Sequence, residues 1–270
     1  MNSDAALALE NITVTFAARS AGATSYTAVR DTTLVVKRGE FVSVVGPTGC
    51  GKSTLLNIAA GLLAPSAGQV RIFEQPLAGL NRKAGYLFQA DALMPWRSAL
   101  DNVAVGLLYG GVPRPEAQAR ARDWLGRVGL AQHGHRYPHQ LSGGMKKRVA
   151  LAQTLIMDPQ ILLMDEPFSA LDVQTRQLME NELLELWSAD RKSVVFITHD
   201  LEEAISLSDR VIVLSAGPAT HPIGEYVIDL PRPRDVAEIR LTPRFVELHR
   251  DIWHRMKDEV MKGYVQSQRI

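Results

Sequence analysis

The chain has 270 residues, 46% of them hydrophobic, and a formal net charge of only +1. This balance of charge excludes the strong basic field of proteins that bind nucleic acid or anionic membranes, and the single cysteine excludes an intramolecular disulfide. No apolar run approaches the length of about 18 residues that crosses a bilayer, and the first residues lack a secretion pattern, so we expect an intracellular protein that acts at a membrane only through a partner.

The first 45 residues predict three strands. Residues 12–16 and residues 32–36 alternate in polarity, which is typical of half-buried antiparallel strands, and the small polar residues 17–25 between them predict a loop. Residues 41–45 are an apolar run rich in β-branched side chains, which is typical of a buried parallel strand.

A glycine-rich stretch follows this strand and leads into a helix predicted over residues 53–60. The stretch consists of Gly46, Pro47, Thr48, Gly49, Cys50, Gly51, Lys52, Ser53 and Thr54. Its glycines let the backbone bend so that N–H groups and the helix N-terminus cradle phosphate. Lys52 is placed to reach the β- and γ-phosphates, and the Ser53 hydroxyl to bind Mg²⁺. A small side chain suffices at Cys50, so we interpret it as filling space, and we expect its alkylation close to the nucleotide to inhibit the protein.

The middle of the chain is helical, and an α/β alternation returns after it. Helices are predicted over residues 98–109 and 115–128, and a third begins at Ser142. Later strands are predicted over residues 161–164, 193–197 and 210–214, and helices over residues 174–188 and 200–206. The last of these helices begins with a capping box of Asp200 and Glu203.

Two further patterns leave alternatives open. The histidines at 133, 135 and 139 suggest a metal site, but no cysteine or carboxylate cluster accompanies them, which disfavours it. Near the C-terminus the apolar residues Phe245, Leu248, Ile252, Met256 and Val260 recur at helical spacing and predict an amphipathic helix. Acidic residues among its basic ones favour packing on its own domain or on a second copy over lying on a membrane.

The order of the motifs along the chain resembles the ATP-binding subunits of ABC transporters over residues 9–214. The matching positions are the glycine-rich stretch, Gln89, the signature Leu141-Ser142-Gly143-Gly144-Met145, Asp165, Glu166, Asp172 and His199. The resemblance implies an α/β fold: a P-loop NTPase core with an antiparallel β-subdomain and an inserted helical subdomain. It divides the chain into a nucleotide-binding domain over residues 1–230, with the helical subdomain at about 91–157, and a C-terminal helical extension over residues 231–270.

The resemblance also implies ATP and Mg²⁺ as cofactors and assigns roles. The catalytic residues are Glu166 as general base, His199, Lys52 and Gln89. Ser53, Gln89 and Asp165 bind the metal. Besides the glycine-rich stretch, four residues contact nucleotide: Ser142, Gly143, Gly144 and Asp172. The signature residues among them bind the ATP of a partner subunit. Met145 replaces the usual glutamine, and we expect activity to survive this. An aromatic residue stacks on adenine, with Phe16 favoured over Tyr26.

A narrower resemblance lies in residues 88–103, in the signature helix and in residues 229–234. It points to importers of nitrate, taurine, aliphatic sulfonates or bicarbonate, although some relatives carry thiamine precursors. The implied partners are a membrane permease, a second ATP-binding subunit in a homodimer and, indirectly, a periplasmic solute-binding protein, with no nucleic acid. The implied location is the cytoplasmic face of the inner membrane.

Pro95 and Trp96 are expected to line the groove that receives the permease, unless Trp96 packs within its own helical subdomain. Two other functions remain as alternatives. One is the ATPase subunit of an exporter or lipid-extracting complex. The other is a soluble ABC ATPase acting on DNA or ribosomes, although paired cassettes, coiled-coil insertions and strongly basic surfaces are not visible in the sequence.

Overall fold

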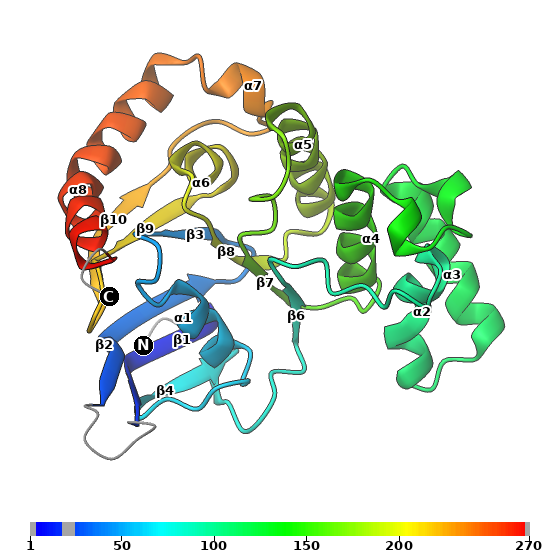
Figure 1. Ribbon diagram of the computed structural model, residues 1–270, viewed down its shortest axis with the longest axis horizontal. Coiled ribbons are helices and arrows are strands. Elements are labelled where there is room, and N and C mark those ends of the chain that lie inside the picture. The colour runs from blue at the N-terminus through cyan, green and yellow to red at the C-terminus, as the bar shows by residue number, and fades with distance from the viewer. Residues whose placement is uncertain (1–3, 18–24, 268–270) are drawn as a thin grey trace.

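A computed structural model describes residues 4–17 and 25–267 of the chain. Figure 1 shows two β-sheets, a group of helices that extends to one side of them, and a long C-terminal helix at the periphery. None of the helices in the described part of the chain combines the length and the apolar character needed to span a bilayer.

The first sheet is antiparallel and has the strand order β2-β1-β4-β5. Its strands are β1 (Ala5–Phe16), β2 (Tyr26–Lys37), β4 (Ala67–Ile72) and β5 (Gln75–Pro76). The strands predicted over residues 12–16 and 32–36 lie within β1 and β2 and pair antiparallel, which confirms that prediction, although both strands are longer. The predicted loop over residues 17–25 lies mostly outside the described residues.

The second sheet has the strand order β10-β9-β3-β8-β7-β6. Its strands are β3 (Phe41–Val45), β6 (Ala84–Leu87), β7 (Ile161–Asp165), β8 (Ser193–Ile197), β9 (Arg210–Leu214) and β10 (Pro222–Val227). All pairs are parallel except that of β9 with β10. Every residue of β3 and β8 is buried, as expected for parallel strands covered on both faces. The carboxyl ends of these strands therefore meet at one edge.

Helix α1 (Lys52–Ala59) joins the two sheets. It begins inside the glycine-rich stretch, and its Leu55, Leu56 and Ile58 side chains are buried. They belong to one apolar core with residues of both sheets, among them Val14 of β1 and Leu163 of β7. The packing of α1 between the sheets thus fixes the glycine-rich stretch against the edge of the second sheet.

The helices that extend to one side in Figure 1 are α2 (Ala99–Tyr109), α3 (Arg114–Arg127) and α4 (Gly143–Leu155). Short 3₁₀ turns at Ala131–His133 and Pro138–Gln140 precede α4. The structure confirms, within a residue or two, the helices predicted over residues 98–109 and 115–128 and the helix that begins at Ser142. These helices share a core of their own, and α4 also contacts β6 of the second sheet.

The remaining helices are α5 (Val173–Asp190), α6 (Leu201–Leu207), α7 (Val236–Ile239) and α8 (Pro243–Ser267). The apolar face of α8, with Phe245, Leu248, Ile252 and Met256, is buried in a core with residues of α6 and β9. The amphipathic helix therefore packs on its own chain, one of the predicted alternatives. The domain boundary at residue 230 stays a prediction.

Candidate active site

The predicted site residues come from the carboxyl ends of adjacent strands. The glycine-rich stretch follows β3, Asp165 is the last residue of β7, and His199 comes two residues after β8. Because β3, β8 and β7 are neighbours and run parallel, these segments lie at the same edge of the sheet. Most of the catalytic residues expected from the sequence are thus brought together by the fold.

The glycine-rich stretch forms a tight loop around the ammonium group of Lys52. Gly49 and Gly51 have φ angles of +75° and +101°, which residues with a Cβ rarely adopt. The Lys52 Nζ donates hydrogen bonds to the carbonyl oxygens of Gly46 at 2.9 Å and Pro47 at 3.0 Å, and the side chain is buried. The loop thereby places a cation and the N-terminus of α1 at one point, which is a phosphate-binding arrangement.

Two side-chain oxygens beside this loop, from Ser53 and Asp165, are suited to bind a magnesium ion. The Ser53 hydroxyl donates to Oδ1 of Asp165 at 3.0 Å, so the first turn of α1 touches the end of β7. Burial raises the pKa of the Asp165 carboxyl, and the hydrogen bond from Ser53 opposes this rise. Hard oxygen ligands of this kind suit Mg²⁺. No group of three or more His, Cys, Asp or Glu side chains among the described residues is placed to hold a metal.

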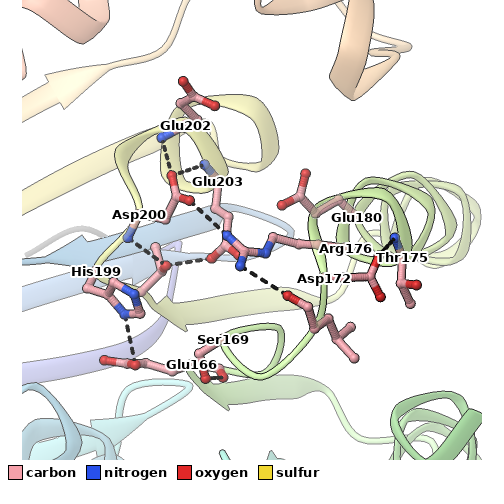
Figure 2. Close-up of polar contacts among 12 residues, drawn as sticks. Glu166, Ser169, Asp172, Thr175, Arg176, Glu180, His199, Asp200, Glu202 and Glu203 are labelled. Atoms are coloured by element: carbon pink, nitrogen blue, oxygen red, sulfur yellow. Dashed lines mark hydrogen bonds and ion pairs between the residues drawn. The ribbon is translucent and has the colours of Figure 1, made fainter. Parts of the chain in front are cut away.

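Glu166 and His199 form a second pair at the same edge. The Glu166 Oε2 lies 2.9 Å from Nδ1 of His199. Figure 2 marks this contact between the two side chains with a dashed line. Glu166 has a φ of +42°, a strained value for a residue with a side chain. Its backbone is fixed in this conformation because its N–H donates to the Ile197 carbonyl at 2.9 Å and its carbonyl accepts from the Ser169 hydroxyl at 3.0 Å. A carboxylate held in this way can accept a proton from a water molecule placed next to it.

The signature residues meet another segment, the turn before α5. Ser142 caps α4, its hydroxyl accepting from the Met145 N–H at 3.3 Å. A Cβ on Gly144 would lie 2.7 Å from Cγ2 of Thr175, so a side chain at this position would require Thr175 to shift at the start of α5. Asp172 caps α5 by accepting from the Thr175 N–H at 3.0 Å, and this hydrogen bond lowers the pKa of its carboxyl. The signature and the Asp172 turn therefore form one surface with two helix N-termini.

Gln89 is placed by its backbone. Its carbonyl oxygen accepts a hydrogen bond from Nζ of the buried Lys147 at 2.6 Å, and Lys147 also pairs with Asp91 at 3.0 Å. Among the described residues, no hydrogen bond joins the Gln89 side chain to Ser53 or Asp165. The structure thus ties this segment to the signature helix rather than to the predicted metal ligands.

The two candidates for adenine stacking lie side by side. Phe16 ends β1 and Tyr26 begins β2, and the two are cross-strand partners. Their exposed fractions are similar, 42% and 48%. A Cβ on Gly217 would lie 3.5 Å from the Tyr26 hydroxyl and 3.7 Å from Cα of Cys50. Both aromatic side chains are therefore accessible, and the choice between them stays open.

The environment of Cys50 revises the expectation about alkylation. The residue is only 1% exposed, and a Cβ on Gly46 would lie 3.1 Å from its Sγ. Burial raises the pKa of the thiol, and the nearby Lys52 only partly opposes this. Because the thiolate is the reactive form, the structure indicates a packing role and slow alkylation.

A groove of about 470 Å³ lies between β6, the segment after it and the end of α4. Its lining includes Tyr86, Phe88, Asp91, Gln153 and Met157, and the rings of Tyr86 and Phe88 stack at 4.2 Å. Neither Pro95 nor Trp96 belongs to this lining, and their place in a groove that receives the permease stays a prediction. Phe88 belongs to the segment of the sequence that resembles importers, next to Gln89, but no role was predicted for its side chain.

Trp96 is not buried in the helical part of the chain. Its exposed fraction is 73%, which excludes the alternative that it packs within its own helical subdomain. It belongs to a turn that ends at the start of α2, close in sequence to the groove but outside it. The side chain is therefore free to contact a partner.

The chain is similar to known proteins along most of its length. A family model described as "ABC transporter" matches residues 29–169. The chain is 43% identical over 254 residues to a taurine import ATP-binding protein of Rhizobium johnstonii, covering 91% of this chain and 94% of the relative. It is 48% identical over 231 residues to an uncharacterized ABC transporter ATP-binding protein of Methanocaldococcus jannaschii, covering 85% and 84%. A solved dimeric ATP-binding cassette in a post-hydrolysis state with ADP and Pi is 34% identical, with a TM-score of 0.72 and coverage of 83% and 100%.

Proposed function

The chain belongs to the ABC transporter family and is an ATPase that energises the import of a small solute, and we propose that this solute is a small sulfonate such as taurine. The similarity to a taurine import subunit along nearly the whole chain is the observation that supports this choice. Nitrate and bicarbonate are the competing solutes. In this proposal the permease and a periplasmic solute-binding protein select the solute, because the chain itself supplies only the energy.

We propose that the paired residues at the sheet edge perform the hydrolysis. Phosphoryl transfer needs positioning, charge neutralisation and a proton acceptor more than covalent chemistry. Glu166 accepts the proton of the attacking water, and His199, which its carboxylate contacts, donates a hydrogen bond to the γ-phosphate. Lys52 exchanges its two loop carbonyl acceptors for phosphate oxygens. Ser53 and Asp165 would hold Mg²⁺, whose charge neutralises phosphate oxygens when it is bound, with Gln89 as the further ligand proposed.

We propose that each ATP is shared between two copies of the chain. The N-terminus of α4, where Ser142 and Gly143 are exposed and Gly144 is buried, would receive the phosphate of the partner's nucleotide. The dimeric relative supports this assembly. Lys52 and Ser142 of one chain then serve different ATP molecules. Mixing inactive Lys52→Ala and Ser142→Arg chains should restore ATPase activity, because half the mixed dimers' sites are intact. Absence of any recovery, with dimer formation verified, would count against sharing.

We further propose that the chain works as a peripheral subunit at the cytoplasmic face of the inner membrane. The groove lined by Phe88 and Met157 would receive a helix of the permease, next to the segment that carries Gln89. In this proposal residues 1–230 form the nucleotide-binding domain, with the helical subdomain at about 91–157, and residues 231–270 are the extension. The proposal includes no nucleic-acid partner.

Uptake into proteoliposomes tests the transport function. The chain is reconstituted with its permease, with the solute-binding protein and radiolabelled taurine added outside and ATP enclosed. Wild-type chains should drive uptake that unlabelled taurine and alkyl sulfonates suppress and nitrate and bicarbonate do not. Glu166→Gln chains in the same vesicles are the matched control. ATP-dependent uptake of labelled nitrate or bicarbonate without uptake of taurine would reject taurine as the solute. ATP-driven release of labelled taurine enclosed in a separate vesicle preparation would favour an exporter.

A further inference from the structure

Arg176, one turn into α5, connects two segments of the site that are far apart in the sequence. Its NH1 donates to Oδ2 of Asp200 at 3.1 Å, and its NH2 donates to the carbonyl oxygen of Leu171 at 3.2 Å. Its Nε lies 3.7 Å from Oε1 of Glu203. Figure 2 shows the guanidinium between the turn that carries Asp172 and the start of α6. The side chain is 23% exposed, so these contacts are largely removed from solvent.

The residues on either side of His199 belong to the same network. Asp200 caps α6, its Oδ1 accepting from the N–H groups of Glu202 at 2.8 Å and Glu203 at 3.3 Å. The Thr198 hydroxyl accepts from the Asp200 N–H at 3.0 Å and donates to Oε2 of the buried Glu203 at 2.5 Å. The predicted capping box is therefore only half formed, because Glu203 turns to Thr198 and Arg176. The backbone that presents His199 is fixed from both sides.

On the other side the network reaches the signature. The Leu171 carbonyl that Arg176 holds directly precedes Asp172, the cap of α5. The Leu171 side chain lies beside the signature, where a Cβ on Gly143 would be 3.7 Å from its Cδ2. Arg176 thus bonds to both the turn that packs against the signature and the segment that carries His199.

We propose that Arg176 is a positioning residue that sets His199, and through it Glu166, relative to the Asp172 turn. The inference rests on the proposed roles of His199 and Glu166. A guanidinium suits this task because its donors lie in a rigid fork that can hold a carboxylate and a carbonyl together, whereas a lysine ammonium is a single point charge. A change at the Asp172 turn, which packs beside the signature proposed to bind the partner's nucleotide, then reaches the catalytic pair of the same chain.

Steady-state ATPase measurements on Arg176→Met test the proposal, with Arg232→Met as the matched control. Arg232 makes contacts of the same kind, to the Asp209 carboxylate at 2.8 Å and the Leu207 carbonyl at 2.7 Å, and is 15% exposed. Arg232 follows β10 in the chain, but its partners Leu207 and Asp209 directly precede β9, so it is held at the amino edge of the sheet, away from the site. We expect Arg176→Met to lower kcat at least about tenfold with KM for ATP within about twofold, and Arg232→Met to leave both within about twofold at a similar loss of Tm. A normal kcat in Arg176→Met, or equal kcat losses in the two variants, would overturn the proposal.

A double-mutant cycle with Asp200→Asn supplies a second measurement. Asparagine retains an acceptor for the α6 cap but removes the charge that faces Arg176. If the two residues act as a unit, the double variant is no slower than the slower single variant, whereas multiplied losses would contradict the link. Arg176→Lys, which keeps the charge, replaces Arg176→Met if the latter does not fold, with the same low kcat expected. His199→Ala distinguishes a failure of this inference from a failure of the proposed function. If that variant hydrolyses ATP at the normal rate, the proposed role of His199 is wrong, rather than the role of Arg176.

Discussion

Replacement of Trp96 by alanine should weaken binding to the permease without changing nucleotide affinity. The turn that carries Trp96 is held by the buried Asn102, which makes four hydrogen bonds to the backbone of Met94, Arg97 and Ser98. A rigid turn presents the indole to a partner at little cost in conformational entropy. Aromatic side chains placed in this way are frequent anchors of interfaces.

The expected loss follows from the exposed area of the side chain. Trp96 is 73% exposed, which for an indole side chain of about 250 Å² leaves about 180 Å² accessible. If the permease covers half of this area, the apolar contact contributes about 2 kcal/mol at about 25 cal/mol per Å². Removal of the side chain should then raise the Kd for the permease by about thirtyfold.

The assay is a titration of labelled permease in nanodiscs with the wild-type or variant chain, in parallel with binding of a fluorescent ATP analogue. Tyr109→Ala is the matched control, because Tyr109 is 78% exposed but lies at the far end of α2. We expect the control to bind the permease like the wild type. An unchanged Kd for Trp96→Ala, or an equal loss in both variants, would refute the reasoning.

Three further predictions concern single residues. Cys50 should react with N-ethylmaleimide at least about tenfold more slowly than a peptide thiol, as measured by mass spectrometry, because its thiol is buried. Met145→Gln should leave ATP turnover within about twofold, since the Met145 backbone rather than its side chain contacts Ser142. Burial raises the pKa of Glu180 to about 8 against the opposing effect of Arg240, so the folded chain retains a proton that the unfolded chain has lost. The protonated Glu180 contributes fully to the free energy of unfolding below pH 4.5, and this contribution is lost as the pH rises to about 8. The free energy of unfolding falls by up to about 1.4 kcal/mol per pH unit in this range. Glu180→Gln should flatten this dependence in thermal melts, and an equal slope in both proteins would contradict it.

The sequence predicts best those elements whose own side chains specify them. Residues 41–45 and 193–197 are apolar except for one serine each, and both are fully buried strands in the structure. The strands β4 and β10 were not predicted, because β4 has a largely exposed face and β10 is partly exposed along its length. Such strands form through pairing with β1 and β9, which no local pattern reveals.

The same distinction holds for the candidate site. Motifs that follow predicted parallel strands had to meet at the carboxyl edge of the sheet, so the proximity of Ser53 to Asp165 could be anticipated. The contact of Arg176 with Asp200 could not, because it joins residues 24 positions apart on two helices. The groove at Phe88 likewise depends on how α4 packs against β6.

The oligomeric mass of Glu166→Gln in the presence of ATP, measured by analytical ultracentrifugation, tests the central claim most directly. If Glu166 is the general base of a site shared between two chains, this variant should bind ATP without hydrolysing it. It should then sediment at twice the mass of one chain in ATP and at the mass of one chain in ADP. A variant that stays monomeric in ATP, or that turns ATP over at the wild-type rate, would contradict the claim.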